Sequence, residues 1–209
     1  MDIILATHNK GKVAEFERIF RNYDVTFFKL GDVGITSEPV ENGSSFSQNA
    51  QIKLDYYLNI MQINKSLNNL GNNLILSEDS GIEIDALNGE PGVISARYGG
   101  GDLSSFGRNK LVLKKLSGLP STKRKARFVC CIKVANIEMD LQYEFSGYCE
   151  GIIRNHVSGS KGFGYDPIFQ PLRYDVSMAN LRGEDKDKIS HRGDACSKLK
   201  EELLSRYER

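Results

Sequence analysis

The chain has 209 residues, 40% of them hydrophobic and 26% charged, with a formal net charge of +1 at pH 7. These values are ordinary for a soluble globular protein, and the near-neutral charge argues against a general nucleic-acid coat, which would carry a strong basic excess. No run approaches the roughly 20 apolar residues of a membrane span. We therefore expect one domain, 1–209, without direct nucleic-acid or membrane partners.

The cysteines have no C-x-x-C spacing, so they indicate neither a zinc site nor a redox motif: Cys130, Cys131, Cys149 and Cys196. The first two lie in an apolar stretch typical of a buried strand, which favours core thiols. The opening apolar run is too short for a signal peptide. Together these features predict a cytoplasmic location.

Strand-like and helix-like segments alternate along the first half of the chain, and neighbouring strands follow later. In chain order we predict a strand at 2–6, a polar loop at 7–12, a helix at 13–20, a strand at 25–30, a loop at 31–45, a helix at 46–61, turns at 64–73, two short strands joined by an acidic turn at 78–81, a helix at 102–116, an antiparallel hairpin at 125–153, mostly loop at 154–181 and a helix at 189–207. This order predicts an α/β fold, with helices packed on a mixed sheet.

A polar stretch between the first strand and the first helix is suited to an anion. Backbone N–H groups at a helix start favour negative charge, and the stretch adds lysines and directional donors: Thr7, His8, Asn9, Lys10, Gly11 and Lys12. It does not match the G-x-x-x-x-G-K-[ST] phosphate loop. A solvated turn with a helix N-cap is therefore an equal alternative.

The acidic stretch Glu78–Gly81 follows an apolar strand. Adjacent carboxylates suit Mg²⁺, which needs only one or two protein carboxylates beside substrate phosphates. The alternative is an acidic β-turn in which glycine supplies an unusual backbone angle, and it is the simpler interpretation of Asp79 alone.

The stretch KGFGYDPIF, Lys161 to Phe169, combines glycines with aromatic rings. Glycines let the backbone approach a flat ligand, and an aromatic ring can stack on a nucleobase, which is worth about 1–3 kcal/mol. The loop therefore suits a base better than a phosphate, through Phe163, Gly164, Tyr165 and Asp166. The alternative is a packed Ω-loop whose aromatic residues belong to the core.

Donors suited to carbonyl oxygens or phosphate gather near the C-terminus: Lys186, Ser190, His191 and Arg192. The alternative is a helix start with Ser190 as N-cap and the charged side chains on a wet face. The stretch PGVISARY, residues 91–98, predicts a turn in which Arg97 is either structural or substrate-facing.

These segments in this order resemble the inosine triphosphate pyrophosphatase family, whose members are also called dITP/XTP pyrophosphatases. The resemblance covers essentially the whole chain, and it rests on T-x-N-x-x-K, F-x-x-N-A-x-x-K, EDSG, PGVISARY, GFGYDPIF and K…SHRG. It implies hydrolysis of ITP, dITP and XTP to the monophosphate and pyrophosphate, with Mg²⁺. It also implies a homodimer and a long mixed β-sheet flanked by helices, with two lobes and a central cleft.

The resemblance also implies roles for individual residues. Thr7 to Lys12 would contact the triphosphate, Asp79 would bind Mg²⁺ and act as the base, and Ser80 would contact the substrate. The purine pocket would consist of Phe163 to Asp166, Lys186, His191 and Arg192. Physically, Lys53 is expected to join Lys12 in neutralising the phosphates.

Three sites depart from the usual family pattern, and at one of them Gln48 replaces a frequent glutamate. His8 stands where glycine is common, so a larger side chain lies in the first loop. The usual pair of acids before the second helix is Val40-Glu41 here. Glu41 is therefore our choice for the second metal ligand, with Glu38 as the substitute.

Three other functions are compatible with parts of the sequence. One is a pyrophosphatase for other modified nucleotides, and the SHR stretch argues for a purine instead. Another is a non-catalytic purine nucleotide sensor, against which the intact Asp79 and Lys12 argue. The least favoured is an RNA-binding module, because the charge is near neutral and no RNP-like aromatic strand is found.

Overall fold

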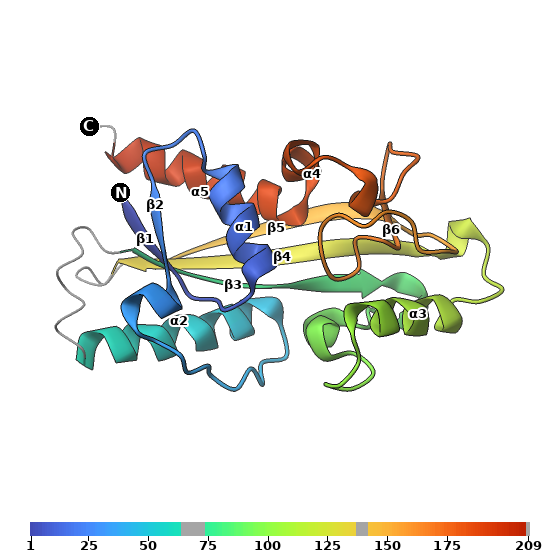
Figure 1. Ribbon diagram of the computed structural model, residues 1–209, viewed down its shortest axis with the longest axis horizontal. Helices are drawn as coiled ribbons and strands as arrows, with labels where there is room; N and C mark the ends of the chain where they lie inside the picture. The colour runs from blue at the N-terminus through green and yellow to red at the C-terminus, as the bar shows by residue number, and fades with distance from the viewer. Residues whose placement is uncertain (64–73, 137–141, 208–209) are drawn as a thin grey trace. The chain divides into compact units, whose positions relative to one another are not determined.

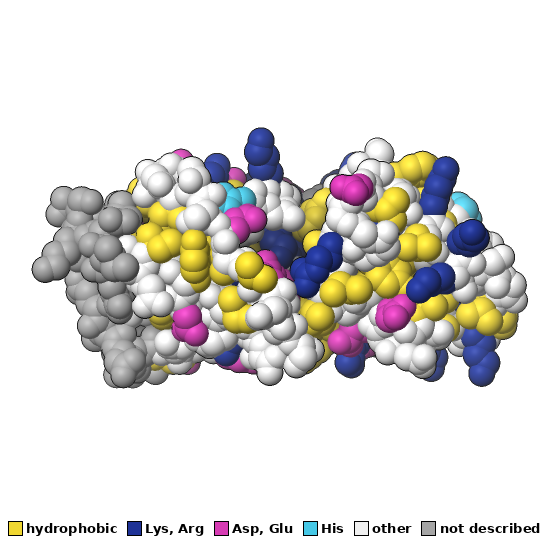
Figure 2. All heavy atoms as spheres, turned by 90° about the horizontal axis from the view of Figure 1, so that it is seen from below, with side chains coloured by type: hydrophobic (Ala, Val, Ile, Leu, Met, Phe, Trp, Pro, Cys, Tyr) yellow, Lys and Arg dark blue, Asp and Glu magenta, His cyan; other side chains and the backbone are white. Residues whose placement is uncertain are grey.

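The structure is a computed structural model that describes residues 1–63, 74–136 and 142–207, with side chains for residues 1–61, 74–136 and 142–202. The predicted turns at 64–73 and the connection within the predicted hairpin, 137–141, lie outside these residues. None of the helices described is long and apolar enough to cross a membrane. Basic, acidic and hydrophobic side chains are interspersed on the face shown in Figure 2.

A mixed β-sheet is the centre of the fold, as the sequence predicts (Figure 1). Within the described residues its strand order is β2-β1-β3-β4-β5-β6. β1 pairs in parallel with β2 and β3, whereas β5 and β6 are antiparallel. The strands are β1 Asp2–Leu5, β2 Thr26–Lys29, β3 Leu74–Ile84, β4 Lys125–Asn136, β5 Gln142–Ile153 and β6 Phe169–Pro171.

Among the described residues, each of the four predicted helices is present, and one further helix was not predicted. The α-helices are α1 Lys10–Ile19, α2 Phe46–Ile63, α3 Ser105–Lys115, α4 Gly183–Ile189 and α5 His191–Tyr207. The sequence pattern missed α4, because it is short and polar and carries no helical apolar stripe. Short 3-10 turns include η1 Leu30–Val33, η4 Gly92–Arg97 and η6 Met178–Asn180.

The predicted acidic turn at 78–81 is wrong, because β3 runs without interruption from Leu74 to Ile84. Glu78 and Asp79 are 1% and 6% exposed within this strand. Two adjacent acidic residues are usually exposed to solvent. Here lysines from other elements neutralise both of them, so the strand can continue through the interior.

The chain forms two compact units. The first comprises Met1–Asp79, Cys131–Ser146 and Ala195–Arg209, and the second comprises Ser80–Cys130 and Gly147–Asp194. Each unit has its own core. In the first, α2 packs on the sheet through Leu54, Tyr57 and Met61, against Ile4 and Ile75.

The core of the second unit gathers residues from strands, from α3 and from the glycine-rich loop. Its members include Ile82, Val112, Phe128, Tyr165 and Phe169. Phe128 and Phe169 meet edge to face with ring centroids 4.6 Å apart, an arrangement that adds to the burial of apolar area. The loop therefore rests on the core through Tyr165 and Phe169.

All four cysteines are buried and none of them forms a disulfide, which confirms the core thiols predicted for Cys130 and Cys131. Burial raises the pKa of the Cys131 thiol to about 11 and that of the Cys149 thiol to about 12. Because the thiolate is the reactive form, roughly one Cys131 thiol in a thousand is reactive at pH 8.

We therefore predict that Ellman's reagent at pH 8 labels less than one thiol per folded chain within minutes. Full denaturation should expose all four. Absorbance at 412 nm measures both numbers. Rapid labelling of two or more thiols in the folded protein would contradict the packing described above.

Candidate active site

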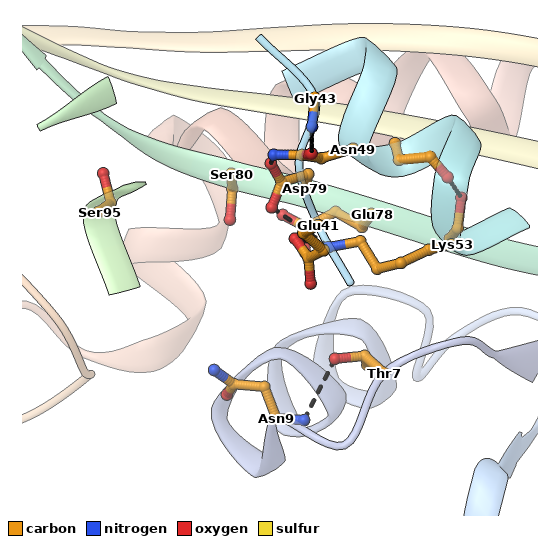
Figure 3. Close-up of polar contacts among 12 residues, drawn as sticks. Thr7, Asn9, Glu41, Gly43, Asn49, Lys53, Glu78, Asp79, Ser80 and Ser95 are labelled. Carbon is orange, nitrogen blue, oxygen red and sulfur yellow. Dashed lines mark hydrogen bonds and ion pairs between the residues drawn. The ribbon is translucent and has the colours of Figure 1, made fainter. Parts of the chain in front are cut away.

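A buried lysine joins two carboxylates in the first unit (Figure 3). The Nζ of Lys53 lies 2.9 Å from Oε2 of Glu41 and 3.2 Å from Oδ1 of Asp79. Lys53 and Asp79 are 7% and 6% exposed. Glu38, the substitute for Glu41 in the sequence analysis, is exposed. The contacts therefore favour Glu41 as the companion of Asp79.

Asn49 connects Asp79 to the loop that carries Glu41, and it is a residue to which the sequence analysis assigned no role. Its Nδ2 donates to Oδ2 of Asp79 at 3.1 Å, and its Oδ1 accepts from the backbone N–H of Gly43 at 2.8 Å. Asn49 and Lys53 stand four residues apart on α2, and so share one helix face. The i, i+4 spacing of the asparagine and the lysine within F-x-x-N-A-x-x-K is the sequence signal that could have identified Asn49 as a site residue.

Burial and charge act in opposite directions on this cluster. Burial raises the pKa of the Asp79 carboxyl, and this outweighs the lowering by Lys53 and Lys12. Burial disfavours the charged form of Lys53, but the negative charges of Asp79 and Glu41 outweigh it and raise the pKa of its ammonium group. Asp79 is thus a stronger proton acceptor than an ordinary aspartate.

Lys12 also reaches the acidic part of β3. Its Nζ lies 2.8 Å from Oε2 of Glu78. The side chain of Lys12 is 12% exposed and that of Glu78 is 1% exposed. Lysines from α1 and α2 therefore neutralise consecutive acids of β3.

The first loop begins a helix, so the N-cap interpretation is confirmed. The Oδ1 of Asn9 accepts from the backbone N–H groups of Gly11 and Lys12, at 2.9 and 3.1 Å. Thr7 Oγ1 accepts from the N–H of Asn9 at 3.1 Å. His8 and Lys10 are exposed. The cap occupies the N–H groups of Gly11 and Lys12, and the N–H of Val13 donates to the carbonyl of Asn9 at 3.1 Å, so it is the positive end of the helix dipole that favours an anion here.

In the second unit, Asp166 organises the glycine-rich loop. Its Oδ2 accepts from the backbone N–H of Phe163 at 2.8 Å and lies 2.5 Å from Nζ of Lys186. A Cβ at Gly162 would lie 2.0 Å from the same oxygen, and the φ of Gly162 is +73°. Only glycine fits at this position, for both steric and conformational reasons.

Cations gather around the ring of Phe163, which is half-buried. The Nζ of Lys186 lies 5.1 Å from the ring centroid and the guanidinium carbon of Arg192 lies 5.7 Å from it. Arg192 is fully buried and its Nη2 donates to Oγ of Ser80 at 3.1 Å. The structure thus brings together Ser80, Phe163, Lys186 and Arg192.

Two predicted site residues pack within the second unit. Tyr165 is 4% exposed, and its hydroxyl donates to the carbonyl of Ser95 at 2.8 Å. His191 stacks on Phe128 with ring centroids 4.7 Å apart and 11° between the planes. Ser190 caps α5, because its Oγ accepts from the N–H of Gly193 at 3.0 Å. The N-cap interpretation is therefore confirmed, but the wet face is wrong, since His191 and Arg192 are buried.

The donor set of the first unit fits a hard divalent cation. Asp79 and Glu41 supply carboxylate oxygens that one ammonium group already bridges, so a positive charge is stable between them. Within the residues described, no group of three or more His, Cys, Asp or Glu is arranged to hold a metal. Two carboxylates match Mg²⁺, which takes its other ligands from water and substrate phosphates.

The sequence profile of the Ham1 family matches residues 3–202. This chain belongs to the Ham1 family. The family resemblance seen in the motifs is thereby confirmed.

Known Ham1 relatives match nearly the whole chain. It is 39% identical over 208 residues to a dITP/XTP pyrophosphatase of Thermoanaerobacter pseudethanolicus, covering 100% of this chain and 99% of the relative. It is 40% identical over 202 residues to the dITP/XTP pyrophosphatase of Bacillus cereus, covering 96% and 94%.

Solved structures agree with this assignment. The Ham1 protein of Staphylococcus aureus has a TM-score of 0.81 at 35% identity, covering 98% of this chain and 99% of that one. A nucleoside-triphosphatase, or dITP/XTP pyrophosphatase, of Mycobacterium abscessus has a TM-score of 0.69 at 35% identity, covering 95% and 98%. The α/β fold with a mixed sheet flanked by helices is thus confirmed.

The raised pKa of Asp79 leads to a stability prediction. A carboxyl group whose pKa is raised by folding stabilises the native state below its unfolded pKa, and this contribution is lost as the pH rises through its native pKa. Ionised Asp79 therefore costs stability at pH 8. Asp79→Asn should have a melting temperature at pH 8 equal to or above that of the unaltered protein, and any advantage should shrink on acidification.

Differential scanning fluorimetry at pH 5 and pH 8 measures this effect. Asp85→Asn, at an exposed position, is the matched control and should show no pH-dependent difference. A melting temperature of Asp79→Asn several degrees below that of the unaltered protein at pH 8 would contradict the assigned direction.

Proposed function

We propose that this protein hydrolyses ITP, dITP and XTP to the monophosphate and pyrophosphate, and so removes deaminated purines from the nucleotide pool. The observation that carries the proposal is the near-full-length likeness to dITP/XTP pyrophosphatases, at 39% and 40% identity. The buried lysine–carboxylate cluster of the first unit and the aromatic–cation cluster of the second support it.

The triphosphate is assigned to the first unit. Its charge must be neutralised before a nucleophile can approach, and Lys12 and Lys53 supply positive charge. Both lysines pair with carboxylates in the structure, which offsets the cost of burying them. Thr7 and Asn9 add polar groups at the N-terminal end of α1, where the helix dipole favours negative charge.

Asp79 and Glu41 would hold Mg²⁺, which when bound supplies Lewis-acid polarisation of phosphoryl oxygens. Asp79 is also proposed as the proton acceptor for the attacking water, because its raised pKa favours proton uptake. The amide of Asn49 occupies Oδ2 of Asp79 and leaves Oδ1 facing Lys53. The orientation of the carboxylate is therefore determined before substrate arrives.

The purine base is assigned to the second unit. Phe163 is the ring for stacking, and Tyr165 anchors the loop from the core. Lys186, His191 and Arg192 are donors that suit the 6-keto oxygen of hypoxanthine and xanthine. Adenine carries an amino group there, and an unpaired buried polar group costs about 1–3 kcal/mol.

The proposal also includes assembly and location. The family resemblance implies a homodimer, with residues 1–209 forming one ITPase-like domain of two lobes. The cysteine usage favours a cytoplasmic location. Size-exclusion chromatography with light scattering tests the dimer. A monomer at micromolar concentration that still turns over substrate would contradict this part alone.

The activity is tested by measuring pyrophosphate release from a panel of ITP, dITP, XTP, GTP and ATP, with Mg²⁺ and with EDTA. We expect release from the first three in Mg²⁺, little release from ATP, and none in EDTA. Equal rates for ITP and GTP would overturn the purine-editing function. Bound but uncleaved ITP in Mg²⁺ would instead indicate a nucleotide sensor.

Asp79→Asn tests the catalytic assignment in the same assay. We expect turnover of ITP to fall about 10²-fold or more, the size of effect typical for a general base. The variant should remain folded, as judged by its melting temperature, and Asp85→Asn should keep normal turnover. Near-normal turnover of folded Asp79→Asn would remove Asp79 from the mechanism.

A further inference from the structure

Asn109 is a buried polar residue of α3 that lies outside the site residues assigned above. It is 2% exposed. Its Nδ2 donates to the carbonyl oxygen of Gly164 at 3.1 Å, across 55 positions of the sequence. Gly164 stands between Phe163 and Asp166, so α3 contacts the glycine-rich loop at its centre.

The other end of the same amide is unsatisfied. Oδ1 of Asn109 is buried and has no hydrogen-bond partner among the residues that the structure describes. Leaving a buried acceptor unpaired costs free energy. The opposite amide orientation would place this oxygen against the Gly164 carbonyl and set two acceptors face to face. A leucine of similar size would avoid the cost, so packing alone does not favour asparagine here.

The loop needs such an external contact because its backbone is permissive. Gly164 has a φ of +63°, and nothing lies within 4 Å of a Cβ built on it. A glycine in open space has many accessible conformations. The amide of Asn109 donates to the carbonyl of Gly164, and this glycine directly follows Phe163 and lies two positions before Asp166.

Helix α3 is a rigid carrier for Asn109. Ser104 caps its first turn, because its Oγ accepts from the backbone N–H of Gly107 at 3.1 Å. At the other end, Nη1 of the buried Arg124 donates to the carbonyl of Leu116 at 2.7 Å. A side chain placed by a capped helix positions a loop more accurately than one carried by another loop.

We infer that Asn109 is a positioning residue for purine recognition, which holds the Gly164 carbonyl and thereby keeps Phe163 and Asp166 ready for the base. The inference rests on the proposed function, because it assigns the base to this loop. It predicts that the amide contributes to nucleotide affinity and not to stability.

Asn109→Leu separates these two contributions. The melting temperature should be unchanged or higher, because the unpaired oxygen is removed. The KM for ITP should rise about fivefold to tenfold, the size expected for one hydrogen bond that orders a binding loop, with kcat within about twofold. The Kd of IMP, measured by isothermal titration calorimetry in EDTA, should rise by a similar factor.

Ser104→Ala is the matched control on the same helix. It removes the α3 cap but keeps the Asn109 amide, so it should lower the melting temperature while raising the KM and the Kd of IMP less than Asn109→Leu does. Asn109→Asp is a second variant of nearly the same shape, which sets an acceptor against the Gly164 carbonyl. It should raise both constants at least as much as Asn109→Leu.

Folded variants at position 109 with unchanged KM and unchanged IMP affinity would overturn the inference, and so would a fall in melting temperature without a change in either constant. Failure of the proposed function has a different signature: the unaltered protein would then release no pyrophosphate from ITP. If it still bound IMP, the comparison of the Asn109 variants would remain decisive for the loop.

Discussion

A buried lysine shared between two carboxylates is the interaction on which the proposed chemistry depends. Lys53 contacts Glu41 and Asp79 at hydrogen-bonding distance; the side chains of Lys53 and Asp79 are 9% exposed and that of Glu41 is 31% exposed. Removing charges from water costs several kcal/mol per ion in real proteins, and only close pairing offsets it. Such a cluster is weak as a stabilising device. Its functional importance is that Asp79 is held in one orientation, next to the position proposed for a cation.

The second unit also contains a buried ion pair, in which the lysine contacts a carboxylate. Asp166 and Lys186 form a buried pair at the glycine-rich loop, and the aspartate also accepts a backbone N–H of that loop. In each unit a buried asparagine amide donates a hydrogen bond to an oxygen of the cluster or loop. Asn49 orients the carboxylate of Asp79, and Asn109 holds the backbone of Gly164. Buried amides are well suited to this task, because they have a fixed shape and do not change charge with pH.

Function and stability oppose each other at β3. Burial raises the pKa of Asp79 even though two lysines lie nearby, so ionising this carboxyl, as metal and substrate binding require, costs more here than it does in water. Natural proteins retain such residues where activity requires them, and replacements at these positions commonly stabilise the fold. The strand itself shows the same compromise, since it carries two adjacent acids through the protein interior.

The sequence by itself determined the strands and helices with clear apolar periodicity, such as α2 and the paired strands β4 and β5, because periodicity reports local burial. Its motifs also identified the family and most of the residues around Lys53, Asp79 and Phe163. Only the tertiary structure decided that β3 runs through Glu78 and Asp79 and that Arg192 is fully buried against Ser80. It also revealed that Asn49 contacts Asp79 and that Asn109 contacts Gly164. Those contacts join residues 26 to 112 positions apart. Neutralisation of a charge by a distant partner leaves no local pattern, so no reading of neighbouring residues reveals it.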